Sequence, residues 1–133
     1  MLQVEVVSPE AIIYSGDAEM VVARTVGGGD IAFQPGHVPF IGVLQIWSAK
    51  IIKADGADEF AVHSGFLQMA HDKVTILSDV SETKDEIDIE RATEAKTRAE
   101  AAIAGSEDDS EAKAALQRAQ VRLSVAGVSS ASY

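Results

Sequence analysis

His37 is the residue of this chain that most suggests chemistry, because two prolines bracket it in the stretch DIAFQPGHVPFIG, residues 30–42. An imidazole on a turn stiffened in this way can serve as a general base, a metal ligand or a contact residue. The other two histidines, His63 and His71, are eight positions apart around a glycine-containing strand pattern, which is not the spacing of a helical pair of metal ligands. The sequence therefore predicts no metal site.

No other segment carries a catalytic motif. Ser64 in HSGF is not in a G-x-S-x-G elbow, and GGGD at 27–30 lacks the Lys-Ser/Thr of a phosphate-binding loop. The chain has no cysteine, which excludes disulfides, thiolate chemistry and zinc sites built on sulfur. The acidic run DEIDIE at 85–90 most simply caps a helix. We therefore predict a protein with no catalytic residues that is not itself an enzyme.

Four arginines form a candidate anion site. Arg91 and Arg98 are seven residues apart, and Arg118 and Arg122 are four apart, so each pair lies on one face of a helix. In an antiparallel hairpin Arg91 would lie level with Arg122, and Arg98 near Arg118. Such a cluster can bind a phosphate through paired hydrogen bonds. The alternative is ordinary surface ion pairing, for example between Asp88 and Arg91.

The elements that must position these residues fall into two halves, which together predict an α+β fold. Up to about residue 82 the pattern is that of an antiparallel β-sandwich, as in LQVEVV, where apolar and polar residues alternate. The other strand-like segments are MVVART, IAF, FIGVLQIW, KIIK, FAVHSGFLQM and KVTILS. Turn signals separate them at 15–17, 27–30, 54–58 and 71–73.

Residues 83–133 are predicted to form an α-helical hairpin. Thr83 and Glu86 fit a capping box at its start, and GSEDDS at 105–110 fits the turn, with Gly105 as a C-cap. Small residues recur at helical spacing on both predicted helices: Ala92, Ala95, Ala99 and Ala102, then Ala112, Ala115, Ala119 and Leu123. The tail GVSSASY is predicted to be frayed.

The alanine seam predicts a weakly held hairpin. A buried methyl group contributes about 0.8 kcal/mol, against about 1.5–3 kcal/mol for a leucine or isoleucine side chain. Such a hairpin is a candidate for opening or for exchanging its partner, although permanent docking is equally compatible with these residues.

Charge narrows the choice of partners. The formal net charge of the 133 residues is −10, with no continuous basic run, which argues against nucleic acid. No apolar run is long enough to cross a membrane, and the N-terminus lacks the features of a signal peptide, so we expect a soluble cytoplasmic domain. No acidic residue follows Glu111, while Lys113, Arg118 and Arg122 do. This basic last helix fits an acidic partner surface, or complements its own dipole.

In order and spacing, these segments resemble the epsilon subunit of bacterial rotary ATP synthases over nearly the whole chain. The segments that carry the resemblance are VVSPE at 6–10 with SG at 15–16, GGGDIAFQPGHVPF at 27–40, SGFLQMAHDKVTILSD at 64–79, IDIERATEAKTRAE at 87–100 and ALQRAQVRLSVA at 115–126. The alternative is a free-standing β-sandwich that binds a ligand and has a structural hairpin.

The resemblance implies a non-catalytic rotor subunit with a sandwich of about ten strands over residues 1–82. That domain would join the gamma subunit to the membrane ring of c subunits during ATP synthesis driven by ion transport, at the cytoplasmic face of the bacterial plasma membrane. The implied interface residues are Asp30, Ile31, Pro35, Gly36 and His37. His37 is then a contact residue on a stiffened loop. Ala32 and Gln34 depart from the residues that are common in this loop.

The resemblance also implies a regulatory hairpin over residues 83–133. When extended along gamma it would meet the beta and alpha subunits and block ATP hydrolysis. No cofactor is required, but some members bind ATP on the folded hairpin as a regulatory ligand. The matching positions are Ile87, Asp88, Arg91, Ala92, Arg98, Arg118 and Arg122. Glu111 stands where nucleotide-binding members can have a basic residue.

Overall fold

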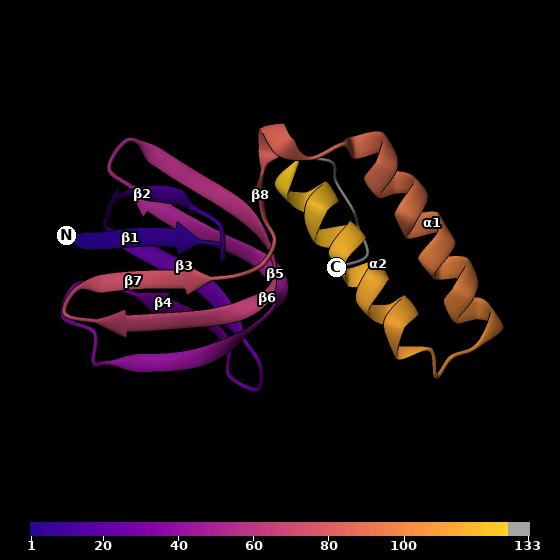
Figure 1. Ribbon diagram of the computed structural model, residues 1–133, viewed down its shortest axis with the longest axis horizontal. Coiled ribbons are helices and arrows are strands. Elements are labelled where there is room, and N and C mark those ends of the chain that lie inside the picture. Colours follow the sequence, from indigo (N-terminus) through magenta and orange to yellow (C-terminus); the bar gives the residue numbers. More distant parts are fainter. Residues whose placement is uncertain (128–133) are drawn as a thin grey trace.

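The computed structural model describes residues 1–127, in which a β-sandwich is followed by two antiparallel helices (Figure 1). This confirms the predicted α+β class. The strands are β1 (Leu2–Val7), β2 (Ile12–Ala18), β3 (Met20–Thr25), β4 (Gly29–Phe33), β5 (Phe40–Lys53), β6 (Gly56–Ala70), β7 (Lys73–Leu77) and β8 (Ser81–Thr83). The helices are the short 3-10 helix η1 (Lys84–Glu86), α1 (Ile89–Gly105) and α2 (Ser110–Val125). The tail predicted to be frayed lies outside the described residues beyond Gly127.

The strands form one sheet in the order β2-β1-β7-β6-β5-β3-β4, with β8 paired to β6. The described chain has eight strands instead of about ten, because β5 and β6 run for 14 and 15 residues. FIGVLQIW and KIIK, predicted as two strands, therefore both belong to β5. The turn predicted at 15–17 lies inside β2, an edge strand in which glycine and aspartate are tolerated.

One strand pair departs from the antiparallel arrangement that the sequence predicts. β1 and β7 run parallel, with Val4 beside Val74 and Val6 beside Ile76. All four of these side chains are fully buried. Pairing in this register adds two alternating apolar rows to the same core, and the intervening strands supply the long connection that a parallel pair requires.

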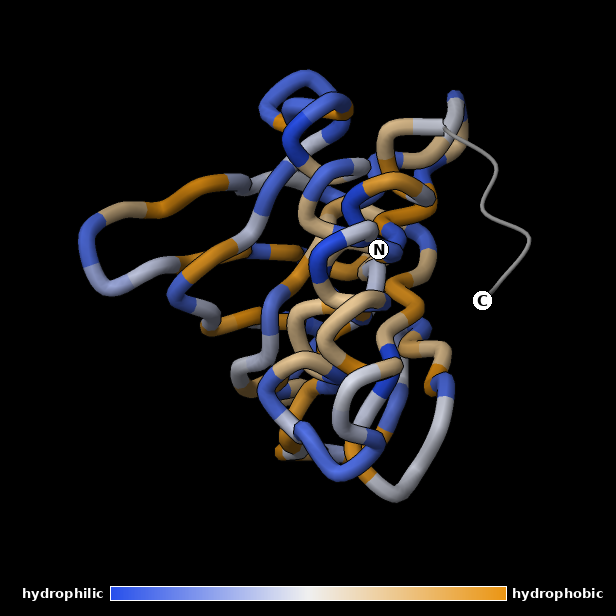
Figure 2. The backbone as a smooth tube through the Cα atoms, turned by 90° about the vertical axis from the view of Figure 1, so that its right-hand side faces the viewer, coloured by the Kyte–Doolittle hydropathy of each residue, from blue (hydrophilic) through white to orange (hydrophobic). Residues whose placement is uncertain are grey.

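The sandwich encloses one apolar core made of large side chains. Apolar stretches, in orange, recur along its strands, and hydrophilic ones, in blue, at many of its turns (Figure 2). The largest fully buried side chains are Phe33, Phe60, Leu2, Ile51, Leu67, Met69, Ile76, Val4, Val6, Val21, Val62 and Val74. Period-2 alternation thus directs one face of β1, β3 and β7 inward, whereas in β6 Phe60, Ala61 and Val62 are all buried because α2 covers the other face there.

The long strand β6 bends in its middle at Ser64 and Gly65. These residues have φ of 65° and 139°, and a Cβ on Gly65 would lie 2.2 Å from the carbonyl oxygen of Leu77. The Ser78 hydroxyl donates to the Ser64 carbonyl over 2.6 Å and holds the bend. Before the bend β6 pairs with β8, and after it with β7, so one strand joins both parts of the sheet.

The hairpin begins later than its first capping signal. The Glu86 carboxylate accepts hydrogen bonds from the backbone N–H and the hydroxyl of Thr83, but this closes only the 3-10 turn η1. α1 starts at Ile89 with Asp88 as its N-cap, and α2 starts at Ser110 with Asp109 as its N-cap. The C-terminal end of α1 also differs from the prediction, because Gly105 is its last residue and Ser106 its C-cap.

In the described chain, α2 makes the main helical contacts with the sandwich, on β5 and β6, and α1 lies on the outer side of α2 (Figure 1). The contact with the sandwich is a small apolar cluster of Ala61, Ile87, Val121, Val125 and Ala126, with Ile46 at its edge. In the seam between the helices, Ala92, Ala99, Ala112 and Ala119 are buried. Ala102 is exposed, contrary to the predicted seam. Within residues 1–127 no helix is long and apolar enough to cross a membrane.

Candidate functional site

The loop that carries His37 is held from two sides. Gly36, with φ of 85°, donates its backbone N–H over 2.8 Å to the carboxylate of Asp72, in the turn after β6. The His37 ring lies 4.9 Å from the ring of Phe33, a fully buried side chain at the end of β4. The loop is thus fixed to the core by an aromatic contact and to a neighbouring turn by a charged hydrogen bond.

The contacts of His37 fit a contact residue better than a base. Its Nδ1 lies 2.7 Å from the carbonyl oxygen of Val38, so Nδ1 carries the proton and donates it. Among residues 1–127 no carboxylate is hydrogen-bonded to this ring, and no group of three potential ligands is placed to hold a metal ion. Val38, the next residue, is one of the most exposed large apolar side chains of the described chain.

Asp30 lies at the other end of β4, paired with Arg24 of β3 over 2.9 Å. The guanidinium group of Arg24 also lies 3.8 Å from the centre of the Trp47 ring. The hydrogen bond from Arg24 holds the pKa of the Asp30 carboxyl below its ordinary value, although burial slightly opposes this. The five predicted interface residues therefore form two groups, Asp30 with Ile31 near the start of β4, and the Pro35–His37 turn beyond its end.

An apolar stripe that no local sequence pattern predicts crosses five strands. Strand register places Ile12, Val7, Leu77, Phe66 and Val43 side by side on β2, β1, β7, β6 and β5. Except for the half-buried Val7, these side chains are between 43% and 60% exposed. An open pocket of about 260 Å³ adjoins the stripe. An exposed apolar row of this extent is typical of a docking surface.

A second pocket, of about 280 Å³, lies between the two helices and β8. Its lining includes three of the four predicted arginines, Arg91, Arg98 and Arg122, together with Asp88. Two further carboxylates, Glu82 and Glu86, share the lining. The pocket is therefore polar and of mixed charge, and its guanidinium groups come from both helices.

The remaining predicted positions lie around this pocket. Arg118 is turned away and pairs with Glu111 over 2.9 Å. Ile87 and Ala92 are buried, Ile87 in the cluster that joins the hairpin to the sandwich. Asp88 accepts a hydrogen bond from the backbone N–H of Arg91 over 3.1 Å and so caps α1. The expected side-chain pairing of Asp88 with Arg91 is replaced by this cap.

The carboxylates that line the pocket already have partners, whereas two of its guanidinium groups are open to a ligand. Glu86 is bonded to Thr83, and Glu82 to a histidine and an arginine. In the part of the chain that the structure describes, the side chains of Arg91 and Arg98 form no ion pair. Two unpaired guanidinium groups that face one polar pocket can bind an anion.

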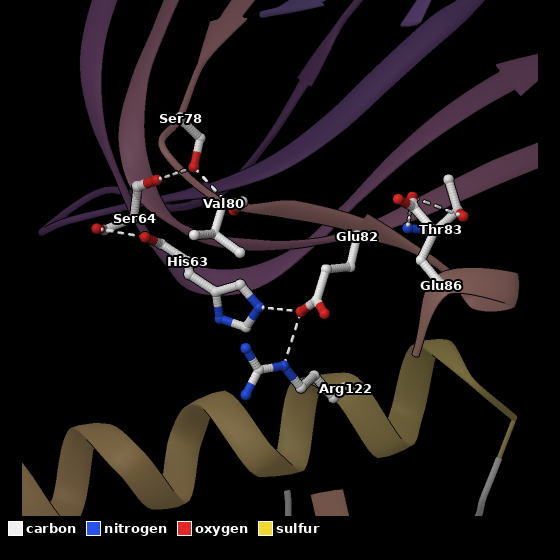
Figure 3. A network of polar contacts seen from close by, with 8 residues as sticks. All are labelled: His63, Ser64, Ser78, Val80, Glu82, Thr83, Glu86 and Arg122. Carbon is white, nitrogen blue, oxygen red and sulfur yellow. Dashed lines mark hydrogen bonds and ion pairs between the residues drawn. The ribbon is translucent and has the colours of Figure 1, made fainter. Parts of the chain in front are cut away.

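His63, Glu82 and Arg122 form a polar triad where α2 meets the sandwich (Figure 3). One oxygen of Glu82, on β8, lies 2.7 Å from Nε2 of His63 on β6 and 2.7 Å from Nε of Arg122 on α2. Gln117 adds a second polar contact, donating over 2.9 Å to the carbonyl oxygen of Ile46 on β5. These bonds are the directional part of the docking contact, which the apolar cluster completes.

The triad shifts the titration of both of its weak acids. Burial is the largest influence on His63 and lowers its pKa; the hydrogen bond to Glu82 opposes this, and the charge of Arg122 adds to the lowering. Burial acts against ionisation of Glu82, but hydrogen bonds from Arg122 and His63 outweigh it and lower its pKa. At neutral pH the triad therefore contains a neutral imidazole, a carboxylate and a guanidinium ion.

Comparison with known proteins identifies the family. Residues 1–84 match the beta-sandwich domain of the ATP synthase delta/epsilon chain, and residues 85–127 match its long alpha-helix domain. The ATP synthase epsilon chain of Shouchella clausii is 41% identical, over 94% of each chain. That of Bacillus velezensis is 43% identical, over 95% of this chain and 97% of its own. That of Streptomyces griseus is 41% identical, over 96% of each chain.

Solved structures agree on the fold. A chain of the Euglena gracilis mitochondrial ATP synthase, in a structure of OSCP, F1 and the c-ring, superposes with a TM-score of 0.70 at 18% identity. The superposition covers 96% of this chain and 78% of that one. Because the family matches cover both the sandwich and the hairpin, and the curated relatives match nearly end to end, this chain belongs to the ATP synthase epsilon chain family, whose members are non-catalytic subunits.

Proposed function

We propose that this chain is the central-stalk epsilon subunit of a bacterial ATP synthase, at the cytoplasmic face of the plasma membrane. Its sandwich joins the gamma subunit to the c-ring, and its hairpin restrains ATP hydrolysis when it leaves the sandwich. The single observation that carries the second half of the proposal is that, in the described chain, the hairpin packs on β5 and β6 mainly through α2 and a small apolar cluster. A hairpin held in this way can be released without unfolding the sandwich core.

The apolar stripe supports docking of the sandwich on gamma. Its exposed members are aligned across the sheet, so they form one continuous surface. Burial of the exposed half of a side chain such as Phe66 would contribute roughly half of the about 1.5–3 kcal/mol that full burial gives. The exposed pair Asp30–Arg24 is the polar candidate for contact with the c-ring, and the loop around His37 is a candidate for contact close to gamma.

The hairpin pocket supports ATP as a regulatory ligand of the docked state. Its guanidinium groups come from α1 and α2, so an anion bound between them would favour the folded hairpin in proportion to its differential affinity. Titration calorimetry with ATP tests this. We expect Arg98→Ala to weaken binding by about tenfold or more, because it removes a charged hydrogen bond. Arg118→Ala should weaken it less, because that side chain is paired with Glu111. Equal losses of ATP affinity in the two variants would contradict binding of ATP in this pocket.

The function itself is tested by ATP hydrolysis. The host's catalytic head is assayed alone, with the full chain, and with residues 1–84, which keep every strand and the sandwich core. We expect both forms to bind the head through gamma and only the full chain to slow hydrolysis. If both bind and neither slows hydrolysis, the inhibitory role is wrong while the rotor role stands. If neither binds, the rotor role is wrong.

A further inference from the structure

We propose that His63 makes the docking of the hairpin on the sandwich sensitive to pH, so that acidification releases α2. The proposal deepens the regulatory role suggested above and rests on it only for its consequence in the enzyme. The observation behind it is the polar triad that bridges three elements at the docking contact (Figure 3).

The docked structure holds His63 in its neutral form by geometry. Nε2 lies 2.7 Å from the Glu82 carboxylate, so in the neutral ring Nε2 carries the proton and Nδ1 is a bare acceptor. Nδ1 is buried and has no hydrogen-bond partner among the described residues. A second proton would go to Nδ1 and create a buried donor without an acceptor, which is unfavourable.

The charges around the ring point the same way. Glu82 on β8 faces it and favours the imidazolium ion, but the same carboxylate oxygen is already bonded to Arg122. Arg122 and Arg118 on α2 both act against a positive ring. On β5 the paired residue is the uncharged Ile46, and Asp79 lines the pocket that His63 adjoins. Arg122 thus shares the Glu82 carboxylate with the ring, whereas Arg118 has its own partner in Glu111.

Release of α2 removes the two influences that keep the His63 ring neutral, namely the nearby arginines and the burial of the ring. The two arginines leave with the helix, and the ring, only 5% exposed in the docked state, gains access to water. Glu82 remains on β8, next to β6 in the sheet, and loses its other partner. An exposed histidine beside a free carboxylate binds a proton at least as readily as an ordinary one, near pH 6.5.

The sign of the pH dependence follows from linkage. The released state binds a proton that the docked state disfavours, because docking lowers the pKa of His63. Docking is therefore strongest at a pH above the pKa that His63 has in the released state. It weakens as the pH falls from there toward the lower pKa that His63 has in the docked state. Between these limits the docking equilibrium changes by at most about tenfold per pH unit. An acidified cytoplasm would then favour the extended, inhibitory hairpin.

The test measures opening of the docking contact in the full chain. Because the sequence has no cysteine, Val121→Cys introduces a single thiol into a site that is fully buried between α2 and the sandwich. Its rate of reaction with an aromatic disulfide reagent reports openings even when they are rare. Ser106→Cys, at an exposed position in the hairpin turn, measures the intrinsic reactivity at each pH. The ratio of the two rates gives the protection of the contact.

We expect protection to fall several-fold, up to about tenfold, between about pH 7.5 and about pH 5.5. In a His63→Gln background, which retains an N–H donor but does not titrate, protection should be constant over this range. The matched control His71→Gln, at an exposed histidine in the turn after β6, should retain the full response. Constant protection in the unmodified background, or an equal fall with His63→Gln, overturns the proposal. Neither readout uses ATP hydrolysis, so failure of the inhibitory role would be seen separately.

Discussion

The two regions of this protein are built from side chains of different size. The sandwich core is filled by phenylalanine, leucine, isoleucine, methionine and valine, whereas the seam between the helices is made largely of alanine. The contact that joins the regions is a cluster of five small or β-branched side chains with a polar triad beside it. The contrast teaches that one molecule contains a permanent scaffold and an element with much less apolar area to hold it in place.

The largest effect should come from the sandwich core. Phe60 is 1% exposed and its ring lies 5.3 Å from that of Tyr14, so Phe60→Ala leaves a cavity and should cost about 3–5 kcal/mol. Urea unfolding followed by the fluorescence of Trp47, the single tryptophan, measures it. Phe66→Ala is the matched control. At 54% exposure its loss should change the free energy of unfolding by less than about 1 kcal/mol. If the two substitutions lowered the free energy of unfolding by similar amounts, Phe66 in the exposed stripe would contribute as much to stability as Phe60 in the core, contrary to this account.

A smaller effect, confined to the hairpin, should follow from overfilling the seam. Ala119 is fully buried on α2, so Ala119→Leu should force the helices apart at a cost of about 1–3 kcal/mol. Hydrogen exchange should show faster opening of α1 and α2 while the exchange of β1 and β7 is unchanged. Ala102→Leu, at an exposed position of α1, is the control and should change neither. Equal loss of protection in the strands would mean that the two regions unfold together.

A single neutral hydrogen bond of the docking contact should contribute less. Gln117→Met keeps the length of the side chain but removes the donor to the Ile46 carbonyl, at a cost of about 0.5–1.5 kcal/mol. We expect the thiol introduced by Val121→Cys to react about two- to tenfold faster in this background, and unfolding of the sandwich to be unaltered. An unchanged thiol rate would show that this bond does not hold α2.

The smallest effect should come from the exposed pair Asp30–Arg24. Its carboxyl has a lowered pKa in the folded chain, so its contribution is present above the ordinary pKa of aspartate and is lost as the pH falls through the folded value. Asp30→Asn should cost about 0.2–1 kcal/mol at neutral pH and nothing in acid, where the carboxyl is already protonated. Urea midpoints at the two pH values measure this. A larger loss of stability in acid than at neutral pH would show that the Asp30–Arg24 ion pair is not the source of the effect.

Local patterns in the sequence predict much of this architecture. Alternation in LQVEVV indicates β1, and the alanine spacing indicates both helices, because these signals depend only on neighbouring residues. The parallel pairing of β1 with β7 has no such signal, since it depends on the path of five intervening strands. Local patterns do not predict β2 for a related reason: Ser15, Gly16 and Asp17 are turn formers by type, yet an edge strand accepts them.

The candidate sites also divide into features that local sequence patterns predict and features that depend on the tertiary structure. Antiparallel geometry of the hairpin correctly brings Arg91 to the pocket that Arg122 lines, whereas Arg118 is drawn away by Glu111 on its own helix. The polar triad could not be predicted, because it joins residues 19 and 40 positions apart on three elements. The apolar stripe can be identified only after the strand register is known, because its members are adjacent in the sheet and not in the sequence.

The most direct test of this account fixes the hairpin on the sandwich and asks whether inhibition disappears. Ile46→Cys and Gln117→Cys place two thiols where α2 meets β5, and a cleavable bismaleimide can join them in a chain that has no other thiol. The joined chain should bind the catalytic head through gamma without slowing ATP hydrolysis, and cleavage of the link by a reductant should restore the slowing. Equal slowing by the joined and the cleaved chain would contradict the claim that release of the hairpin is what inhibits.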